Sequence, residues 1–174
     1  MIGVPRRTVV LREYNEVWST YFEDEKKKII EVCNNNINDI EHVGSTSVKG
    51  LIAKPIIDIA ATYSEDEAIK EVIESIVSLG YEYVEDNGID DRLYFAKRSN
   101  GMSLFHIHVY HQESMNYKKQ IIFRDYLRKN ENAAKEYCDL KEELYHKYKN
   151  DRPKYTEAKT TFIFAILKKA IESV

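Results

Sequence analysis

The sequence is poor in glycine, proline and cysteine. Its 174 residues include only 6 Gly, 3 Pro and 2 Cys. So little glycine and proline excludes collagen-like, low-complexity and linker-rich chains. Cys33 and Cys138 lie far apart and form no C-x-x-C pair, so neither a disulfide framework nor a zinc motif is expected. The longest apolar run, residues 162–167, is far shorter than the ~20 residues that cross a bilayer.

The N-terminus also lacks the pattern of a secretory signal. Arg6 and Arg7 are followed by only four residues, Thr8 to Leu11, before charge resumes. A signal peptide needs a longer apolar core. With no membrane segment and two cysteines interpreted as reduced thiols, we expect a cytoplasmic protein that does not associate with membranes.

The chain has no excess of positive charge, because its formal net charge is −3. A general nucleic-acid binder is usually basic, so a long nucleic acid is not an expected partner. The charge is nevertheless uneven. Residues 1–114 carry 12 basic and 20 acidic side chains, whereas residues 115–174 carry 14 basic and 9 acidic ones. We expect one domain over residues 1–174, with a sheet-containing part at about 1–114 and a helical part at about 115–174.

Local patterns predict an α+β fold. Apolar residues at helical spacing predict a helix over about 14–33 that ends at Asn34-Asn35-Asn36. Ser64 and Glu67 have capping-box spacing, which predicts a helix that opens at Ser64, carries apolar residues from Ile69 to Leu79 and closes at Gly80. Apolar residues at helical spacing run without a break from Tyr155 to Ala170, which predicts a single C-terminal helix there. Strands are predicted at 37–43, 56–61, 81–84, 92–97 and 104–110, and three helices after about residue 117. The fold class is therefore a mixed or mostly antiparallel sheet flanked by helices, with a C-terminal helical segment.

Residues 42–59 carry the strongest indication of chemistry. A predicted strand ends at Val43, and Gly44 begins a turn of small residues whose backbone can approach a phosphate closely. The next strand carries one carboxylate, Asp58, which is costly to bury unless it is paired or bound to a metal. An ordinary turn and an ion pair between Asp58 and Lys54 are the alternatives. The candidate phosphate donors of this segment are Gly44, Ser45, Thr46, Ser47 and Lys54.

The strand at 104–110 carries two histidines at i, i+2. Alternation predicts that Phe105, Ile107 and Val109 face the core, while His106 and His108 face the other side. Two such imidazoles can both reach one metal ion or one phosphate. A pair of hydrogen-bonded histidines on a half-exposed strand is the alternative.

Three cations in the helical part are further candidates for binding phosphate. Arg124 and Arg128 are four residues apart and share a helix face, and paired guanidinium groups suit phosphate. The alternative is a solvated face on which Asp125 or Glu131 relieves the repulsion. Lys159 lies beside an apolar stripe, either as a lysine that extends to solvent or as a phosphate ligand.

Several of these segments together resemble one family. The string from His42 to Ile59, the His108-Val109 pair, and the segments 123–128 and 155–159 are similar in kind and order to the GrpB family. The resemblance covers about residues 10–172. That family is similar in fold to the nucleotidyltransferase superfamily, which implies a small mixed sheet flanked by helices and followed by C-terminal helices.

The resemblance also implies roles for individual residues. Gly44 and Ser45 would form the turn that holds nucleotide phosphates, and Asp58 would be the first metal carboxylate. The superfamily's acid-x-acid pair is incomplete, because Ala60 stands at the second position. The strand with His106 and His108 takes the place of the third carboxylate. One aspartate with two histidines suits Mn²⁺ or Zn²⁺ better than a pair of Mg²⁺ ions.

Three functions remain open on these residues. The first is metal-dependent transfer of a nucleotidyl group from a nucleoside triphosphate (NTP) to a small-molecule or protein acceptor. In that interpretation Asp58 and His108 are catalytic, and Asp58, His106 and His108 bind Mg²⁺ or Mn²⁺. The second is a non-catalytic nucleotide- or phosphate-binding module with a degenerate site. The third is a metal-dependent hydrolase. A small phosphate-bearing ligand is the expected partner in the first two.

Overall fold

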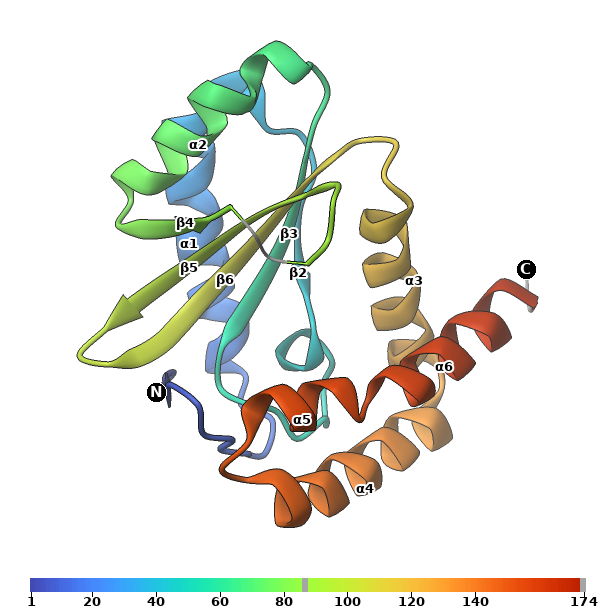
Figure 1. Cartoon of the computed structure of the whole chain (residues 1–174). Coiled ribbons are helices and arrows are strands. Elements are labelled where there is room, and N and C mark those ends of the chain that lie inside the picture. Colours follow the sequence, from blue (N-terminus) through green and yellow to red (C-terminus); the bar gives the residue numbers. More distant parts are fainter. Residues whose placement is uncertain (86–87, 173–174) are drawn as a thin grey trace.

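The computed structural model describes residues 1–85 and 88–172 and contains one six-stranded mixed sheet (Figure 1). The strand order is β2-β3-β6-β5-β4, and β1 pairs with the beginning of β6. β3 and β6 are parallel, whereas the other pairs are antiparallel. The expected mixed sheet is therefore confirmed. The strands are β1 (Val4–Pro5), β2 (Ile40–Val43), β3 (Ile57–Tyr63), β4 (Tyr81–Val84), β5 (Arg92–Ser99) and β6 (Met102–His111).

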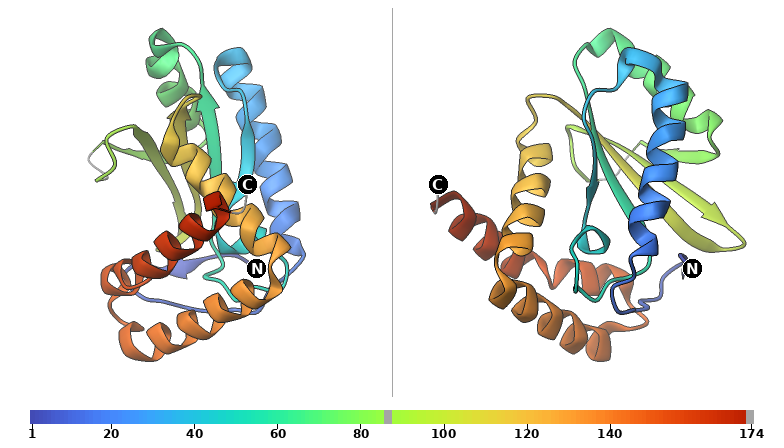
Figure 2. Two further views of the ribbon diagram at one scale, coloured as in Figure 1. Left: turned by 90° about the vertical axis from the view of Figure 1, so that its right-hand side faces the viewer. Right: turned by 180° about the vertical axis from the view of Figure 1, so that it is seen from behind.

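Helices lie on both sides of this sheet (Figure 2). Two of them, α1 (Val17–Cys33) and α2 (Ile69–Ser78), pack on the face that carries the main apolar core. Ile57, Ile59 and Ile107 are fully buried there, and Phe105 and Val109 join them, as the alternation of β6 predicted. Because strand side chains alternate, Asp58, His106 and His108 face the opposite side.

The C-terminal helices gather on that opposite side, around the end of β2 (Figures 1 and 2). Val48 and Leu51, which follow the turn after β2, form a second core with the helices. None of the helices in the described part of the chain is long and apolar enough to cross a membrane. The C-terminal helices are α3 (Met115–Lys129), α4 (Glu131–Tyr148), α5 (Arg152–Glu157) and α6 (Thr160–Glu172).

Two local predictions are wrong. Ser64 is not a helix cap. A 3₁₀ turn, η3 (Asp66–Ala68), precedes α2, and the Ser64 hydroxyl instead donates a hydrogen bond to Gln112 and accepts one from Asn38. The stripe from Tyr155 to Ala170 is not one helix, because it is interrupted after α5. The last turn of α5 tightens there, with Lys159 N–H bonded to the carbonyl of Thr156.

Candidate functional site

The parallel pairing of β3 and β6 builds a cluster around Asp58. In this register Asp58 lies beside His106, and Ala60 lies beside His108. The Nδ1 of His106 is 3.1 Å from Oδ1 of Asp58, and the Nε2 of His108 is 3.6 Å from the same oxygen. Tyr94 of β5 contacts both imidazole rings, at centroid distances of 5.5 and 5.2 Å. Asp58 is therefore paired with histidines, and the alternative of an ion pair with Lys54 is not what forms.

The cluster fixes the protonation of its members. Burial acts to raise the pKa of Asp58, but hydrogen bonds and charge from His106 and His108 outweigh it and hold that pKa well below its ordinary value. Asp58 is therefore ionised at neutral pH. Burial lowers the pKa of His108 despite the opposing carboxylate, which keeps its imidazole neutral. The Nδ1 of His108 lies 3.4 Å from Nη1 of Arg92, so both ring nitrogens of His108 face a neighbour.

The turn after β2 touches this cluster at one point. Gly44 has φ of +69°, in the left-handed region that favours glycine. A Cβ at this position would lie 2.8 Å from Oδ2 of Asp58. The backbone of the turn therefore approaches the carboxylate more closely than any residue with a side chain allows. Because β2 pairs with β3 up to Val43 and Asp58, this close approach is set by the sheet itself.

The three hydroxyl residues of the turn, η2 (Ser45–Ser47), have different roles. The Ser47 hydroxyl donates a 2.6 Å hydrogen bond to the carbonyl of Gly44 and stabilises the turn. The Thr46 hydroxyl is buried and lies 2.9 Å from Nε2 of His42. Burial lowers the pKa of His42 to about 4, so this imidazole is neutral and structural. The Ser45 hydroxyl is the one of the three that Lys141 approaches, at 3.3 Å.

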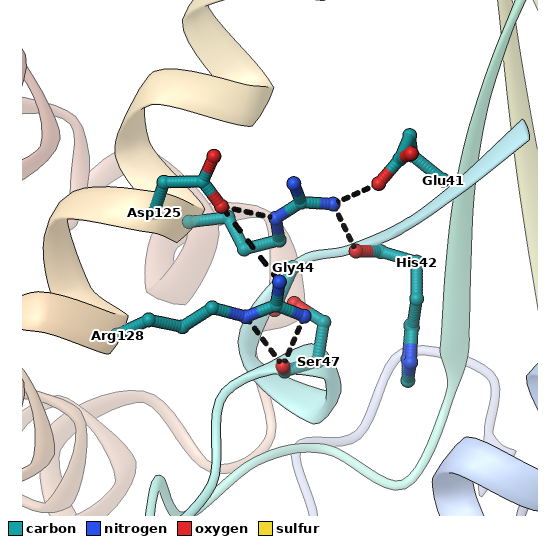
Figure 3. A network of polar contacts seen from close by, with 7 residues as sticks. Glu41, His42, Gly44, Ser47, Asp125 and Arg128 are labelled. Carbon is teal, nitrogen blue, oxygen red and sulfur yellow. Dashed lines mark hydrogen bonds and ion pairs between the residues drawn. The ribbon is translucent and has the colours of Figure 1, made fainter. Parts of the chain in front are cut away.

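Arg124 and Arg128 support the turn from behind, and Figure 3 shows Arg128 at the carbonyl of Ser47. Arg128 donates hydrogen bonds of 3.2 and 2.8 Å from Nε and Nη2 to the carbonyl of Ser47. Arg124 is 7% exposed, and it bonds the carbonyl of His42 and the carboxylates of Glu41 and Asp125. Asp125 pairs with both guanidinium groups and so relieves their repulsion, but this is not the solvated face of the alternative, because Arg124 is buried. The structure does not bring either arginine to the cavity described next.

A cavity of about 440 Å³ opens between the Gly44 turn, the Asp58 cluster and the C-terminal helices. We call it the lysine cavity, because Lys54, Lys141 and Lys159 line it together with Asp58. Lys141 is 2% exposed and bonds the carbonyl of Ile52. The Nζ atoms of Lys54 and Lys159 lie 5.6 and 4.8 Å from the ring centre of Tyr155. Further residues that line the cavity are Gly44, Ser45, Thr46, Arg92, Lys119 and Arg152.

The three lysines are poorly solvated and repel one another. Burial, together with the charges of Lys159 and Arg152, lowers the pKa of Lys54 to about 7. Burial is also the main cause that lowers the pKa of Lys141 to about 7 and that of Lys159 to about 8. The positive charge of Lys54 and Lys141 is therefore only partly formed at neutral pH, even with the Asp58 carboxylate in the cavity. An anion in the cavity favours the charged forms and would restore it.

The structure brings some of the residues singled out from the sequence together at this cavity and places others elsewhere. Gly44, Ser45, Thr46, Lys54, Asp58 and Lys159 all line the cavity, as does His106. Ser47, Arg124 and Arg128 hold the turn instead of lining it. Lys141 and Arg152 were missed. A signal for Lys141 exists, because it lies one helical turn after Tyr137 on the buried face of α4, where a lysine interrupts the apolar stripe.

The protein side chains alone do not make a finished metal site. Within the part of the chain that the structure describes, no group of three or more His, Cys, Asp or Glu side chains is arranged to hold a metal ion. His106 and His108 direct ring nitrogens at the carboxylate, as hydrogen-bonding partners do. The Asp58 side chain is still 31% exposed beside these histidines. This donor set fits a hard cation that arrives with a polyphosphate, because Mg²⁺ commonly takes one protein carboxylate and several phosphate oxygens.

Comparison with known proteins identifies the family. A family profile described as GrpB protein matches residues 8–169. The chain belongs to the GrpB family. A glutamate-rich protein GrpB from Alkalihalophilus pseudofirmus is 35% identical over 96% of this chain and 98% of its own length. The UPF0157 protein YqkA from Bacillus subtilis is 36% identical over 91% of this chain, which spans only 46% of that relative's length.

Solved structures agree with this assignment. The crystal structure of conserved protein GrpB from Enterococcus faecalis has a TM-score of 0.86 and 32% identity, covering 94% of this chain and 98% of that one. A cytoplasmic RNA terminal U-transferase is a more distant match, with a TM-score of 0.48 and 8% identity over 70% of this chain. That second likeness is too distant to inform activity. The GrpB-family fold and the α+β architecture expected from the sequence are thus both established.

Proposed function

We propose that this protein binds an NTP in the lysine cavity and transfers its nucleotidyl group to an acceptor. The observation that carries the proposal is that Lys54, Lys141 and Lys159 line one cavity together with the turn whose backbone approaches Asp58. One buried and two half-buried lysines beside a single carboxylate fit a compact ligand with several negative charges. The triphosphate of an NTP is such a ligand, and a cavity of about 440 Å³ is within the size range of small-molecule sites.

Each residue then has a defined part. The lysines and Ser45 would hold the phosphates, and Asp58 would contribute one oxygen ligand to Mg²⁺ or Mn²⁺ carried in by the NTP. A divalent ion bound there supplies charge neutralisation at the phosphates. In the transfer, an acceptor oxygen forms a bond to the α-phosphorus, the bond to the bridging oxygen breaks, and pyrophosphate leaves.

The geometry favours His106 over His108 as the proton acceptor. Both nitrogens of His108 face Arg92 or Asp58, whereas His106 directs Nδ1 at Asp58 and lines the cavity. An Nδ1–H bond to a carboxylate leaves Nε2 to take the proton from the acceptor, and ionised Asp58 stabilises the imidazolium that results. His106 is thus the proposed base, and His108 positions Asp58.

A second candidate is a nucleotide-binding module without catalysis. One observation favours it, namely that Ala60 provides no second carboxylate and that its neighbour across the strands is His108. A site with one carboxylate holds a metal ion less firmly than one with two. In this alternative the lysine cavity keeps its ligand, but the α-phosphorus is not attacked.

The experiment is a titration with each NTP, with and without Mg²⁺ or Mn²⁺, followed by thermal shift and calorimetry. We expect metal-dependent stabilisation in the wild type and its loss in Asp58→Ala. Asp139→Ala is the matched control, because Asp139 is an exposed carboxylate on α4 outside the cavity. Release of pyrophosphate with an acceptor present separates transfer from mere binding. Stabilisation that ignores both metal and Asp58 would contradict the transferase proposal, and no binding of any NTP would contradict both candidates.

A further inference from the structure

A second concave surface lies beside the Asp58 cluster and is rich in arginine. It has a volume of about 570 Å³ and lies between the N-terminal segment, the β5–β6 strands and the beginning of α5. We call it the arginine groove, because Arg6, Arg7, Arg98 and Arg152 line it. Glu157 lines it too, so the groove has a strong excess of positive charge. Three of these arginines come from the part of the chain that is acidic overall.

The guanidinium groups of this groove have unused hydrogen-bonding capacity. Nε of Arg98 is buried without a hydrogen-bond partner, although its Nη1 pairs with Glu82. Among the described residues, no carboxylate forms an ion pair with Arg6, Arg7 or Arg152. A buried donor without a partner is costly, so it indicates a group that is satisfied when a ligand is bound.

The backbone of the groove departs from regular geometry at Arg98 and at Arg7. The β5–β6 register shifts between Lys97 and Arg98, and bulges of this kind re-aim side chains next to functional sites. Arg7 adopts φ of +67°, which is uncommon for a residue with a long side chain. The adjacent Thr8 hydroxyl donates a 3.1 Å hydrogen bond to the carbonyl of Pro5 and fixes this turn.

The groove and the lysine cavity meet at two residues. His106 and Arg152 line both of them, so a molecule in the groove reaches the imidazole that bonds Asp58. The lysine cavity approaches the same cluster from the side of the Gly44 turn. Two ligands, one in each space, would therefore face each other across His106.

We propose that the arginine groove binds the carboxylate or phosphate group of a small second substrate, which is the acceptor of the nucleotidyl group. This inference rests on the proposed function. Planar guanidinium groups recognise carboxylate and phosphate through paired hydrogen bonds, which lysines do not provide. The volume of about 570 Å³ suits a small molecule, and the four arginines face one concavity. The acceptor is thus an anionic metabolite, held so that its nucleophilic oxygen lies near His106.

The test observes the arginine side chains directly by NMR. Nε–H signals of ¹⁵N-labelled protein are followed during titration with inorganic phosphate and, separately, with citrate. The Arg98 signal reports on the groove alone, because Arg98 does not line the lysine cavity. Arg6→Gln/Arg7→Gln is the test variant. Lys27→Gln/Lys70→Gln, on α1 and α2, is the matched control, because it removes the same two charges from exposed positions outside both spaces.

We expect the Arg98 and Arg152 signals to shift along a saturating curve while Arg124, which is engaged behind the turn, stays unchanged. Affinity should fall about tenfold in the test variant, equivalent to about 1.4 kcal/mol, and remain unchanged in the control. The stronger of the two probes assigns the group as phosphate or carboxylate. Shifts that are linear, or that are equal in the wild type and both variants, overturn the proposal.

The outcome also separates this inference from the proposed function. If NTP fails to bind but the groove signals still saturate, the transferase proposal fails, and the groove stands as an anion site without an acceptor role. If NTP binds in a metal-dependent way and the groove signals do not respond, the transferase proposal stands and the groove proposal is overturned.

Discussion

Gly44→Ala is the substitution for which the structure predicts the most specific effect. The added methyl group meets two obstacles. Gly44 has φ of +69°, a conformation that costs an L-residue with a side chain about 1–2 kcal/mol. The new Cβ also lies 2.8 Å from Oδ2 of Asp58 and 3.2 Å from its Cβ. Asp58 must then rotate away from His106, which weakens the 3.1 Å contact between them.

The loss of stability is the sum of the conformational cost at Gly44 and the cost of displacing the Asp58 side chain. An off-rotamer side chain costs roughly 0.5–1.5 kcal/mol, and a weakened hydrogen bond to a charged group costs about 1 kcal/mol more. Gly44→Ala should therefore lower the free energy of unfolding by about 3 kcal/mol. Gly50→Ala is the control in the same loop, because φ is +84° there and nothing lies within 4 Å of the added Cβ. It should cost only the conformational part, about 1 kcal/mol, since alanine also restricts the unfolded chain.

The contact between the turn and Asp58 is measured by urea denaturation of four variants. These are Gly44→Ala, Gly50→Ala, Asp58→Ala and the double variant Gly44→Ala/Asp58→Ala. Removing the carboxylate removes the nearest atom, so the cost of Gly44→Ala should fall by about 2 kcal/mol in the Asp58→Ala background. Equal losses for Gly44→Ala and Gly50→Ala, or additive effects in the double variant, would refute the proposed approach of the turn to Asp58. Metal-dependent NTP binding should be abolished by Gly44→Ala and preserved by Gly50→Ala.

Three further outcomes are expected. Lys141→Met should leave stability at pH 7 within about 1 kcal/mol of wild type, because a buried cation is replaced by an apolar side chain of similar size. Its affinity for tripolyphosphate, measured by calorimetry, should fall at least about tenfold. The pKa of Lys141 is about 7 in the folded protein and 10.5 ordinarily. The unfolded chain thus binds more protons between these values, so stability should rise with pH from about 7 to 10, less steeply in Lys141→Met; an identical slope would contradict the pKa shift. Arg124→Gln should cost about 2–3 kcal/mol in urea denaturation and Arg128→Gln about 1 kcal/mol, because Arg124 is the more buried of the two; the reverse order would contradict the account of the turn.

Local pattern was enough to predict the sheet and the acidic centre of the site. Alternation on β6 determined that His106 and His108 face away from the core, and the Gly44 turn was found because glycine and small hydroxyl residues follow a strand. These predictions depend on neighbours in sequence. Even the pairing of Asp58 with the histidines required only that the two strands become neighbours, which the family resemblance implied.

The cationic half of the site depends on packing between distant segments, and local pattern cannot supply it. Arg124 and Lys141 lie on neighbouring helices, yet one bonds the carbonyl of His42 behind the turn and the other reaches Ser45 in front of it. Which cation faces the cavity is set by how α3 and α4 pack around the residues after β2. The same holds for Arg152, which a break between α4 and α5 brings to both cavities.

The acidic and basic parts of the chain supply different residues to the lysine cavity. Asp58 is the carboxylate among the described residues that line the lysine cavity, and the acidic part of the chain supplies it. Lys141 and Lys159 come from the basic part, and burial lowers their pKa values to about 7 and about 8. If the proposed anion binds, the lysines take up protons from solvent, so binding and protonation would be coupled. A site of this kind discriminates by charge, because only an anion with several negative groups offsets the desolvation of several lysines at once.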